Sequence, residues 1–170
     1  MPAASAEGSS GLLGPVPAGL WPSTRKRHGC TRLELDYVAE VDIGERRDLG
    51  ASGGGHRYII DILGGQFHGP RLRGRVLPGG ADRHQWLRSD GLKELDALYE
   101  MQTDDGAVLT VRNRVVIDEA APLGRYARSS VRITAPDGPH AWLGRRVFVG
   151  TLESLKPARE AVRISVYLVD

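Results

Sequence analysis

Apolar and polar residues alternate over much of this chain. In residues 32–42 the odd positions are apolar and the even positions are charged, with Val38 as the single exception. Residues 161–169 repeat the pattern, with valine, isoleucine and leucine at the even positions. Because side chains along a strand point to opposite faces in turn, this period of two predicts β-strands with one buried face.

Similar runs follow one another after residue 31. Strands are predicted near residues 56–63, 66–68, 70–77, 81–88, 94–103, 107–117, 125–134 and 145–152. The Asp-Asp-Gly turn at 104–106 joins two of the longest runs, which is a strong signal for a β-hairpin. Only residues 137–144 favour a short helical turn.

Many short strands with so little helix are typical of a β-sandwich or a closed barrel. Closure leaves no strand edge exposed, so we favour the barrel. We therefore predict an all-β fold, a single antiparallel β-barrel of about 8–10 strands over residues 31–170. A barrel of this size can hold one small ligand.

Glycine and proline recur at short intervals between Gly64 and Asp82. This spacing nearly excludes helix and predicts short extended pieces joined by tight turns. Arg71, Arg73 and Arg75 alternate with other residues inside the block, which predicts an exposed strand face. The block ends on Asp82 after a Gly-Gly turn, and such a turn can hold a carboxylate at the mouth of a barrel.

Residues 1–30 are rich in proline, glycine, alanine and serine. We expect a flexible extension there. The alternative is an ordered lid or subunit arm anchored by Trp21. Prolines break the apolar stretch at 12–17 and the basic residues follow it, an order that does not fit a secretory signal. The single cysteine, Cys30, can form no internal disulfide, so we expect a cytoplasmic location.

The formal net charge of +2 lies in the same N-terminal segment. This segment has three basic residues, at 25–27, and a single acidic one, Glu7. Basic and acidic residues are therefore equal in number over residues 31–170. A neutral domain is a poor partner for a phosphate backbone, and no apolar run approaches the length of a membrane span. We therefore expect a small-molecule substrate or ligand as partner, with no nucleic acid and no membrane, and leave a homodimer open.

The motifs of common cofactor and metal enzymes are missing from the sequence. It has no phosphate-binding P-loop, no dinucleotide-binding glycine pattern after a strand, no Gly-x-Ser-x-Gly elbow and no His-Glu-x-x-His. The histidines at 56, 68, 84 and 140 lie on separate predicted elements, without the spacing of a zinc site. We expect no cofactor and no metal site.

Three segments resemble a known family. The first is Gly-Gly-x-Phe-x-Gly-Pro to Pro-Gly-Gly-Ala-Asp at 64–82, the second runs from Glu94 through Thr-Asp-Asp-Gly-Ala to Arg114, and the third is 141–150. Together they resemble small bacterial and fungal proteins catalogued as a domain of unknown function. The resemblance covers residues 31–170 and implies a calycin-like antiparallel barrel. The resemblance implies that members often occur beside biosynthetic or catabolic enzymes. Barrels similar to these can serve as cofactor-free cyclases, isomerases or hydrolases.

Two residues depart from the pattern that the resemblance leads us to expect. Arg83 stands where an aromatic residue often follows the Gly-Gly-Ala-Asp segment. Val115 stands where a glycine often follows Asn-Arg. Both border the candidate site, so the substrate or the activity itself can differ from that of relatives.

Asp82 is the first candidate for chemistry. Among apolar side chains its carboxyl group would serve as a general acid or base. The alternative is a turn residue that hydrogen-bonds nearby backbone N–H groups. By period two, Asp82 shares a strand face with His84, Trp86 and Arg88, so an inward face would supply His84 and Trp86 for substrate binding.

Arg112 and Arg114 share a polar face of the strand after the predicted hairpin turn. Inside a barrel their guanidinium groups would bind a carboxylate or an enolate oxygen. The alternative is a solvent face paired across strands with Asp96 or Glu100. The family resemblance includes Asn113 and Arg114, so we assign Arg114 a catalytic role and Arg112 and Asn113 a substrate-binding one.

Three aromatic residues lie in or near the resembling segments. The phenols of Tyr99 and Tyr126 can donate a hydrogen bond to a developing oxyanion, and the indole of Trp142 can stack on a substrate. The alternative for all three is core packing with the polar tip at the surface. Tyr99 shares an apolar strand face, so we expect it inside the barrel in either case.

These residues lead to one function hypothesis and two alternatives. The first is a cofactor-independent enzyme of cyclase, isomerase or lyase type that transfers protons on a small carbonyl-containing metabolite. Asp82 would be its acid or base, Arg114 and Asn113 would polarise the carbonyl, and Tyr99 or Tyr126 would assist. The alternatives are a non-catalytic barrel that binds a small molecule and an interaction domain without a site.

Overall fold

The computed structural model describes residues 32–170 and consists almost entirely of β-strands. They are β1 (Leu33–Ser52), β2 (Gly55–His68), β3 (Arg73–Val76), β4 (Ala81–Arg88), β5 (Lys93–Thr103), β6 (Val108–Asp118), β7 (Tyr126–Thr134), β8 (Val147–Ser154) and β9 (Ala161–Val169). A short 3-10 helix, η1 (Ala141–Arg145), precedes β8, where a helical turn was predicted. The extension predicted for residues 1–30, including Trp21 and Cys30, lies outside the described residues.

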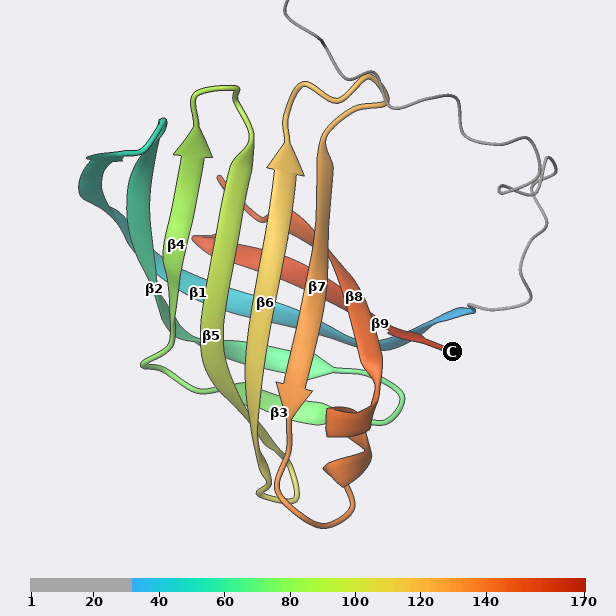
Figure 1. The fold of residues 1–170 in the computed structure, drawn as a ribbon. Coiled ribbons are helices and arrows are strands. Elements are labelled where there is room, and N and C mark those ends of the chain that lie inside the picture. The colour runs from blue at the N-terminus through green and yellow to red at the C-terminus, as the bar shows by residue number, and fades with distance from the viewer. Residues whose placement is uncertain (1–31) are drawn as a thin grey trace, which may run out of the picture. The chain divides into compact units, whose positions relative to one another are not determined.

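The strands close into one antiparallel barrel (Figure 1). Around the ring they follow the order β1, β9, β8, β7, β6 and β5. β5 then pairs with both β3 and β4, each of which pairs with β2, and β2 pairs with β1. β3 and β4 therefore share one position in the ring, and every strand of the described part has neighbours on both sides. The predicted all-β barrel is confirmed.

A pair of glycines allows β2 to cross β1 closely. Gly64 and Gly65 lie inside β2, so the prediction of separate strands at 56–63 and 66–68 was wrong. A Cβ atom at Gly65 would overlap the carbonyl oxygen of Glu40 on β1, and Gly65 has a φ of +140°. Only glycine combines this φ with so close an approach, so the strand continues where we expected a turn.

One end of the barrel, which we call the filled end, is closed by a loop and by η1. Leu72 in the β2–β3 loop and Leu143 in η1 are fully buried there. Arg71 anchors the loop because its Nε donates to the buried carboxylate of Asp36, 2.9 Å away. Burial raises the pKa of Asp36 despite this pairing. Arg71 therefore holds the loop on the barrel, although we predicted it as part of a solvent-exposed face.

Candidate functional site

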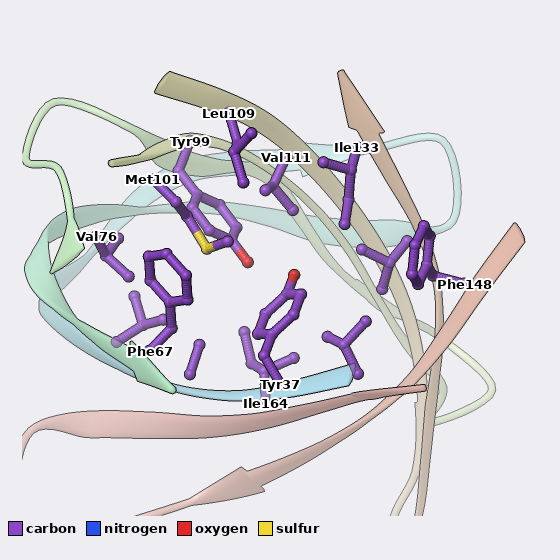
Figure 2. Packing of buried hydrophobic residues seen from close by; sticks show 14 of the residues in the cluster. Tyr37, Phe67, Val76, Tyr99, Met101, Leu109, Val111, Ile133, Phe148 and Ile164 are labelled. Carbon is purple, nitrogen blue, oxygen red and sulfur yellow. The ribbon is translucent and has the colours of Figure 1, made fainter. Parts of the chain in front are cut away.

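Large side chains occupy the half of the lumen next to the filled end. Those at the centre of this cluster are Tyr37, Phe67, Met101, Leu109 and Phe148, all fully buried (Figure 2). The rings of Tyr37 and Phe67 meet edge to face at 5.8 Å. This half of the lumen is a packed core. A ligand site inside the barrel would therefore lie in the opposite half.

The opposite half, which we call the open end, contains a cavity of about 530 Å³. Its apolar walls are formed by Val41, Ile43, Ile60, Ile62, Leu95, Ala97, Val115, Ile117, Leu152, Val162 and Ile164. Ile60, Leu95 and Val162 line this lumen and are only half-buried, so the barrel's own side chains do not fill it. Cavities of this size hold small organic molecules.

Asp82 lines this cavity from β4 and is 7% exposed. Its Oδ1 accepts a hydrogen bond from the backbone N–H of Asp96 on β5, at 3.0 Å. That N–H would otherwise need a partner from β4, where the ladder shifts register after the pairing of Asp82 with Ala97. Asp82 therefore bonds backbone, as the alternative interpretation held, and also faces the lumen, as the site hypothesis required.

A bulge in β4 changes which side chains point inward after Asp82. Between Asp82 and Trp86, β4 has one residue more than the facing segments of β2 and β5. Gln85 consequently lines the cavity, whereas the indole of Trp86 lies against Gly55 on the β1–β2 hairpin. The period-two prediction that Asp82 and Trp86 share one face was wrong, because an extra residue reverses the alternation. The side chain of His84 lies outside the described part of the structure.

Asn113 and Tyr99 face the same cavity as Asp82. Asp82 on β4 pairs with Ala97 on β5, and Ala97 pairs with Asn113 on β6, so the three lie in one row across the sheet. Strand spacing puts the Asp82 and Asn113 backbones about 10 Å apart, with only a methyl group between them. Tyr99 follows two residues after Ala97 and points to the same side. These residues surround a space with room for a ligand.

Several buried polar atoms inside the barrel have no hydrogen-bond partner among the described residues. They include Tyr37 Oη, Tyr99 Oη and Asn113 Oδ1, on side chains that are at least nine-tenths buried. Figure 2 shows the hydroxyl groups of Tyr37 and Tyr99 pointing toward one another in the middle of the barrel. Buried polar groups of this kind are costly unless a partner satisfies them. A ligand with its own polar groups can do so.

Burial raises the pKa values of Tyr37 and Tyr99 far above that of a free phenol. Both side chains therefore stay protonated at neutral pH and can donate a hydrogen bond, but they cannot act as phenolate bases. Burial thus makes Tyr99 a hydrogen-bond donor at neutral pH, beside the carboxyl group of Asp82 in the same cavity.

The raised tyrosine pKa values predict a loss of stability in alkali. Above about pH 10 the unfolded chain releases tyrosine protons that the folded barrel retains, so rising pH favours unfolding. Tyr99→Phe should therefore reduce the fall in unfolding free energy between pH 10 and 11 by about 1 kcal/mol. Urea unfolding at both pH values measures this difference. Tyr126→Phe is the control at an exposed position. The prediction would be contradicted if the unfolding free energy fell equally between pH 10 and 11 in the wild type and both variants.

Arg112 and Arg114 point away from the lumen, which corrects the roles we predicted for them. Both are exposed and bind Asp96 on the outer face of the sheet. Arg112 donates through Nε and Nη2 to the two carboxylate oxygens at 2.8 and 2.7 Å, and Arg114 Nε donates at 3.3 Å. These contacts, Arg112 foremost, lower the pKa of Asp96. The cross-strand alternative describes these residues, because the alternation that buries Asn113 turns its two neighbours outward.

Tyr126 and Trp142 also lie outside the cavity at the open end. Tyr126 is exposed at the start of β7, with the guanidinium of Arg128 5.2 Å from its ring centroid. Trp142 belongs to η1 at the filled end, where its ring centroid lies 6.3 Å from that of Phe148. Of the nine predicted site residues, the structure therefore brings three together at the cavity, Asp82, Tyr99 and Asn113.

Charged residues at the entrance of the cavity escaped the sequence analysis. The cavity lining includes Gln85 and a group that we call the mouth: Arg46, Lys93, Glu119, Arg125 and Lys156. They come from four segments: the middle of β1, the start of β5, the β6–β7 connection and the β8–β9 connection. No spacing in the sequence links them, and only closure of the barrel brings them to one opening.

The described part of the chain shows no metal centre and no membrane-spanning helix. No group of three or more histidine, cysteine, aspartate and glutamate side chains within residues 32–170 is arranged to hold a metal ion. The same residues include no helix that is long and apolar enough to cross a membrane. The cavity at the open end, which gathers Asp82, Tyr99 and Asn113, is the candidate site.

Comparison with known proteins finds bacterial relatives of this chain and a fungal protein that shares its fold. A Rhodopseudomonas palustris protein is 36% identical over 149 residues, 79% of this chain and 94% of its own length. Its crystal structure, described as a conserved protein of unknown function, superposes with a TM-score of 0.74 at 32% identity, covering 82% and 98% of the two chains.

Two further solved structures share the fold. A β-barrel-like protein from Acinetobacter baumannii has a TM-score of 0.73 at 28% identity, covering 82% of this chain and 96% of the other. A protein from Penicillium herquei, described as an enzyme, has a TM-score of 0.68 at 23% identity, covering 85% and 98%. The sequence profile of the family described as "Protein of unknown function (DUF3237)" matches residues 31–169. The chain belongs to this family.

Proposed function

We propose that the open end of the barrel binds a small carbonyl-containing metabolite and catalyses proton transfer on it without a cofactor. The observation that carries this proposal is the row formed by Asp82, Ala97 and Asn113, with Tyr99 beside it. It sets a carboxylate, a phenol and an amide around one small residue in an apolar cavity. Such convergence of a few polar groups in an apolar pocket is typical of an active site.

The chemistry follows from what each side chain can donate or accept. The carboxylate of Asp82 removes a proton from a carbon next to the ligand's carbonyl group, and the electron pair moves onto the carbonyl oxygen. Tyr99 donates a hydrogen bond to the enolate oxygen so formed. Asn113 Oδ1 accepts a hydrogen bond from a hydroxyl group of the ligand. The protonated Asp82 returns the proton to another atom, which completes an isomerisation.

The same enolate can attack a second carbonyl carbon within the ligand. A carbon–carbon bond then forms, the electron pair moves to the second oxygen, and Asp82 supplies the proton to the resulting alkoxide. This sequence is a cyclisation, and it uses the same residues. The description of the Penicillium herquei protein as an enzyme supports catalysis as a use of this fold.

A non-catalytic binding barrel is the second candidate. It is favoured by the largely apolar walls, which give a ligand a place to lie without any chemistry. The two functions share the site and differ in the role of Asp82. In a carrier the carboxylate would only orient the ligand. Its replacement would then change the affinity for the ligand, and there would be no reaction rate to lose.

Blocking the lumen tests whether the cavity is a site at all. Ala97→Phe places a large ring in the middle of the row, so we expect it to weaken binding of N-phenyl-1-naphthylamine, a neutral apolar dye, at least about tenfold. Leu98→Phe is the matched control, because Leu98 is the next residue along β5 and is exposed on the outer face. A fluorescence titration measures both affinities.

Circular dichroism and thermal unfolding establish that both variants keep the barrel. The cavity has room for the added ring, so Ala97→Phe should fold like the wild type. Equal dye affinities for the wild type and Ala97→Phe would show that the dye does not use the lumen. That result would overturn the proposed site.

A further inference from the structure

The mouth of the cavity carries an excess of positive charge. Four of its five charged side chains are basic and only Glu119 is acidic. This excess is local, because basic and acidic residues balance over residues 31–170 as a whole. A cluster of one sign at the entrance of an apolar cavity concentrates ligands of the opposite sign.

Among the described residues, the salt bridges at the mouth engage every cation except Arg46. Glu119 is shared between Lys93, at 3.1 Å, and Arg125, at 3.2 Å. Lys156 pairs with Glu160, outside the cavity lining, at 2.6 Å. Arg46 forms no salt bridge within the described part of the chain. The pKa of nearby Asp48 is lowered mainly by a hydrogen bond from the backbone N–H of Gly50, and the charge of Arg46 adds to this effect from a longer range.

Arg46 is held in place by an aromatic ring and by its position in the sheet. Its guanidinium carbon lies 4.2 Å from the ring centroid of Tyr58. On the β1–β2 ladder Arg46 pairs with Ile60, and both residues line the cavity. A guanidinium stacked on a ring keeps its hydrogen-bond donors in a fixed plane, which suits a carboxylate. The guanidinium of Arg46 thus lies at the edge of the apolar wall of the cavity.

We propose that the ligand of this barrel is an organic anion with a flat apolar body. Its carboxylate binds Arg46 at the mouth, its body lies between Ile60 and Leu95, and its carbonyl group reaches Tyr99. This inference rests on the proposed function, since it assigns a substrate class to the same cavity. The charge at the mouth and the unpartnered polar atoms deep in the lumen are separate observations, and both fit one elongated molecule.

Two dyes that differ in one anionic group test the proposal. The probes are 1-anilinonaphthalene-8-sulfonate, whose sulfonate stands in for a carboxylate, and the neutral N-phenyl-1-naphthylamine. At low salt we expect the wild type to bind the anionic dye about tenfold more tightly than the neutral one. In 1 M NaCl the ratio of the two affinities should shrink, because salt screens the charge at the mouth.

Arg46→Gln identifies the residue responsible. We expect this change to weaken the anionic dye about five- to tenfold and to leave the neutral dye within about twofold. Arg47→Gln is the matched control, because Arg47 is the adjacent residue and pairs with Asp61 outside the cavity lining. It should change neither affinity.

The outcomes separate this inference from the proposed function. If the anionic dye binds no more tightly than the neutral one, or Arg46→Gln weakens both dyes equally, the anionic ligand class is overturned and the lumen site stands. If Ala97→Phe binds the neutral dye as tightly as the wild type does, the lumen is not the binding site and the proposed function is overturned. If Ala97→Phe leaves only the anionic dye bound, that dye uses the outer surface, which also overturns the inference.

Discussion

Replacing Asp82 with asparagine is expected to lower the rate of proton exchange in the lumen about 10²- to 10⁴-fold. Asparagine cannot accept a proton from carbon, but its side-chain oxygen can still accept the hydrogen bond from the backbone N–H of Asp96. The change therefore removes the base and preserves the bond that supports the bulge in β4. One substitution therefore tests the catalytic role of Asp82 without removing its structural hydrogen bond.

A simple enolisable ketone allows the measurement before the natural substrate is identified. We suggest 2-tetralone, a flat bicyclic ketone, whose benzylic hydrogens exchange with deuterium in D₂O and are followed by NMR. Asp61→Asn is the matched control, because Asp61 is a carboxylate on the neighbouring strand β2 that pairs with Arg47 outside the cavity lining. It should exchange like the wild type.

Each possible result distinguishes the enzyme from the carrier. Wild-type exchange that is lost in Asp82→Asn and kept in Asp61→Asn is the outcome that acid–base catalysis requires. Full exchange activity in Asp82→Asn would contradict the role of this residue. Unchanged dye binding by the same variant confirms that the cavity is intact when the rate falls.

Replacing Gly65 with alanine is expected to destabilise the barrel by about 2–4 kcal/mol. The new methyl group would meet the carbonyl oxygen of Glu40, which belongs to the backbone of β1 and cannot turn aside. The residue would also hold a φ of +140°, which side chains rarely adopt. Either β1 and β2 separate at this crossing or the strain remains, and both lower the unfolding free energy.

Gly79→Ala separates the two causes. Gly79 also has a positive φ, of +103°, but a Cβ atom there would have no neighbour within 4 Å. We expect this control to cost only the backbone strain, about 1–2 kcal/mol. Urea unfolding of the two variants measures the difference. If Gly65→Ala were no less stable than Gly79→Ala, the close crossing of β1 and β2 would not be what requires glycine.

Local alternation was sufficient to predict the strands and part of the interior, and the need to close exposed strand edges then favoured a barrel. A period of two is a property of each strand by itself, so the strands and the burial of Tyr99 followed from the sequence. The same alternation puts Asn113 on the face opposite Arg112 and Arg114, although we assigned all three residues to one site, and it does not show which face is the lumen. Two arginines that looked suited to a carbonyl are thus found paired with Asp96 on the outer surface.

Features that depend on two strands at once could not be read from one strand. The bulge in β4 arises from the register in which β2 and β5 pair with this strand, because that register leaves one residue of β4 without a partner. It turns Gln85 inward and Trp86 outward, against the simple alternation. In the same way, Arg46 and Arg125 are 79 positions apart in the sequence, and only closure of the ring brings them to one mouth.

A crystal structure of the protein with N-phenyl-1-naphthylamine bound tests the central claim most directly, because the claim is that the open end of the lumen is a ligand site. We predict that the dye lies against Ala97, between Asp82 and Asn113, with its rings on Ile60 and Leu95. A dye bound only on the outer face of the sheet, beside Arg114 and Tyr126, with the lumen unchanged, would contradict the account.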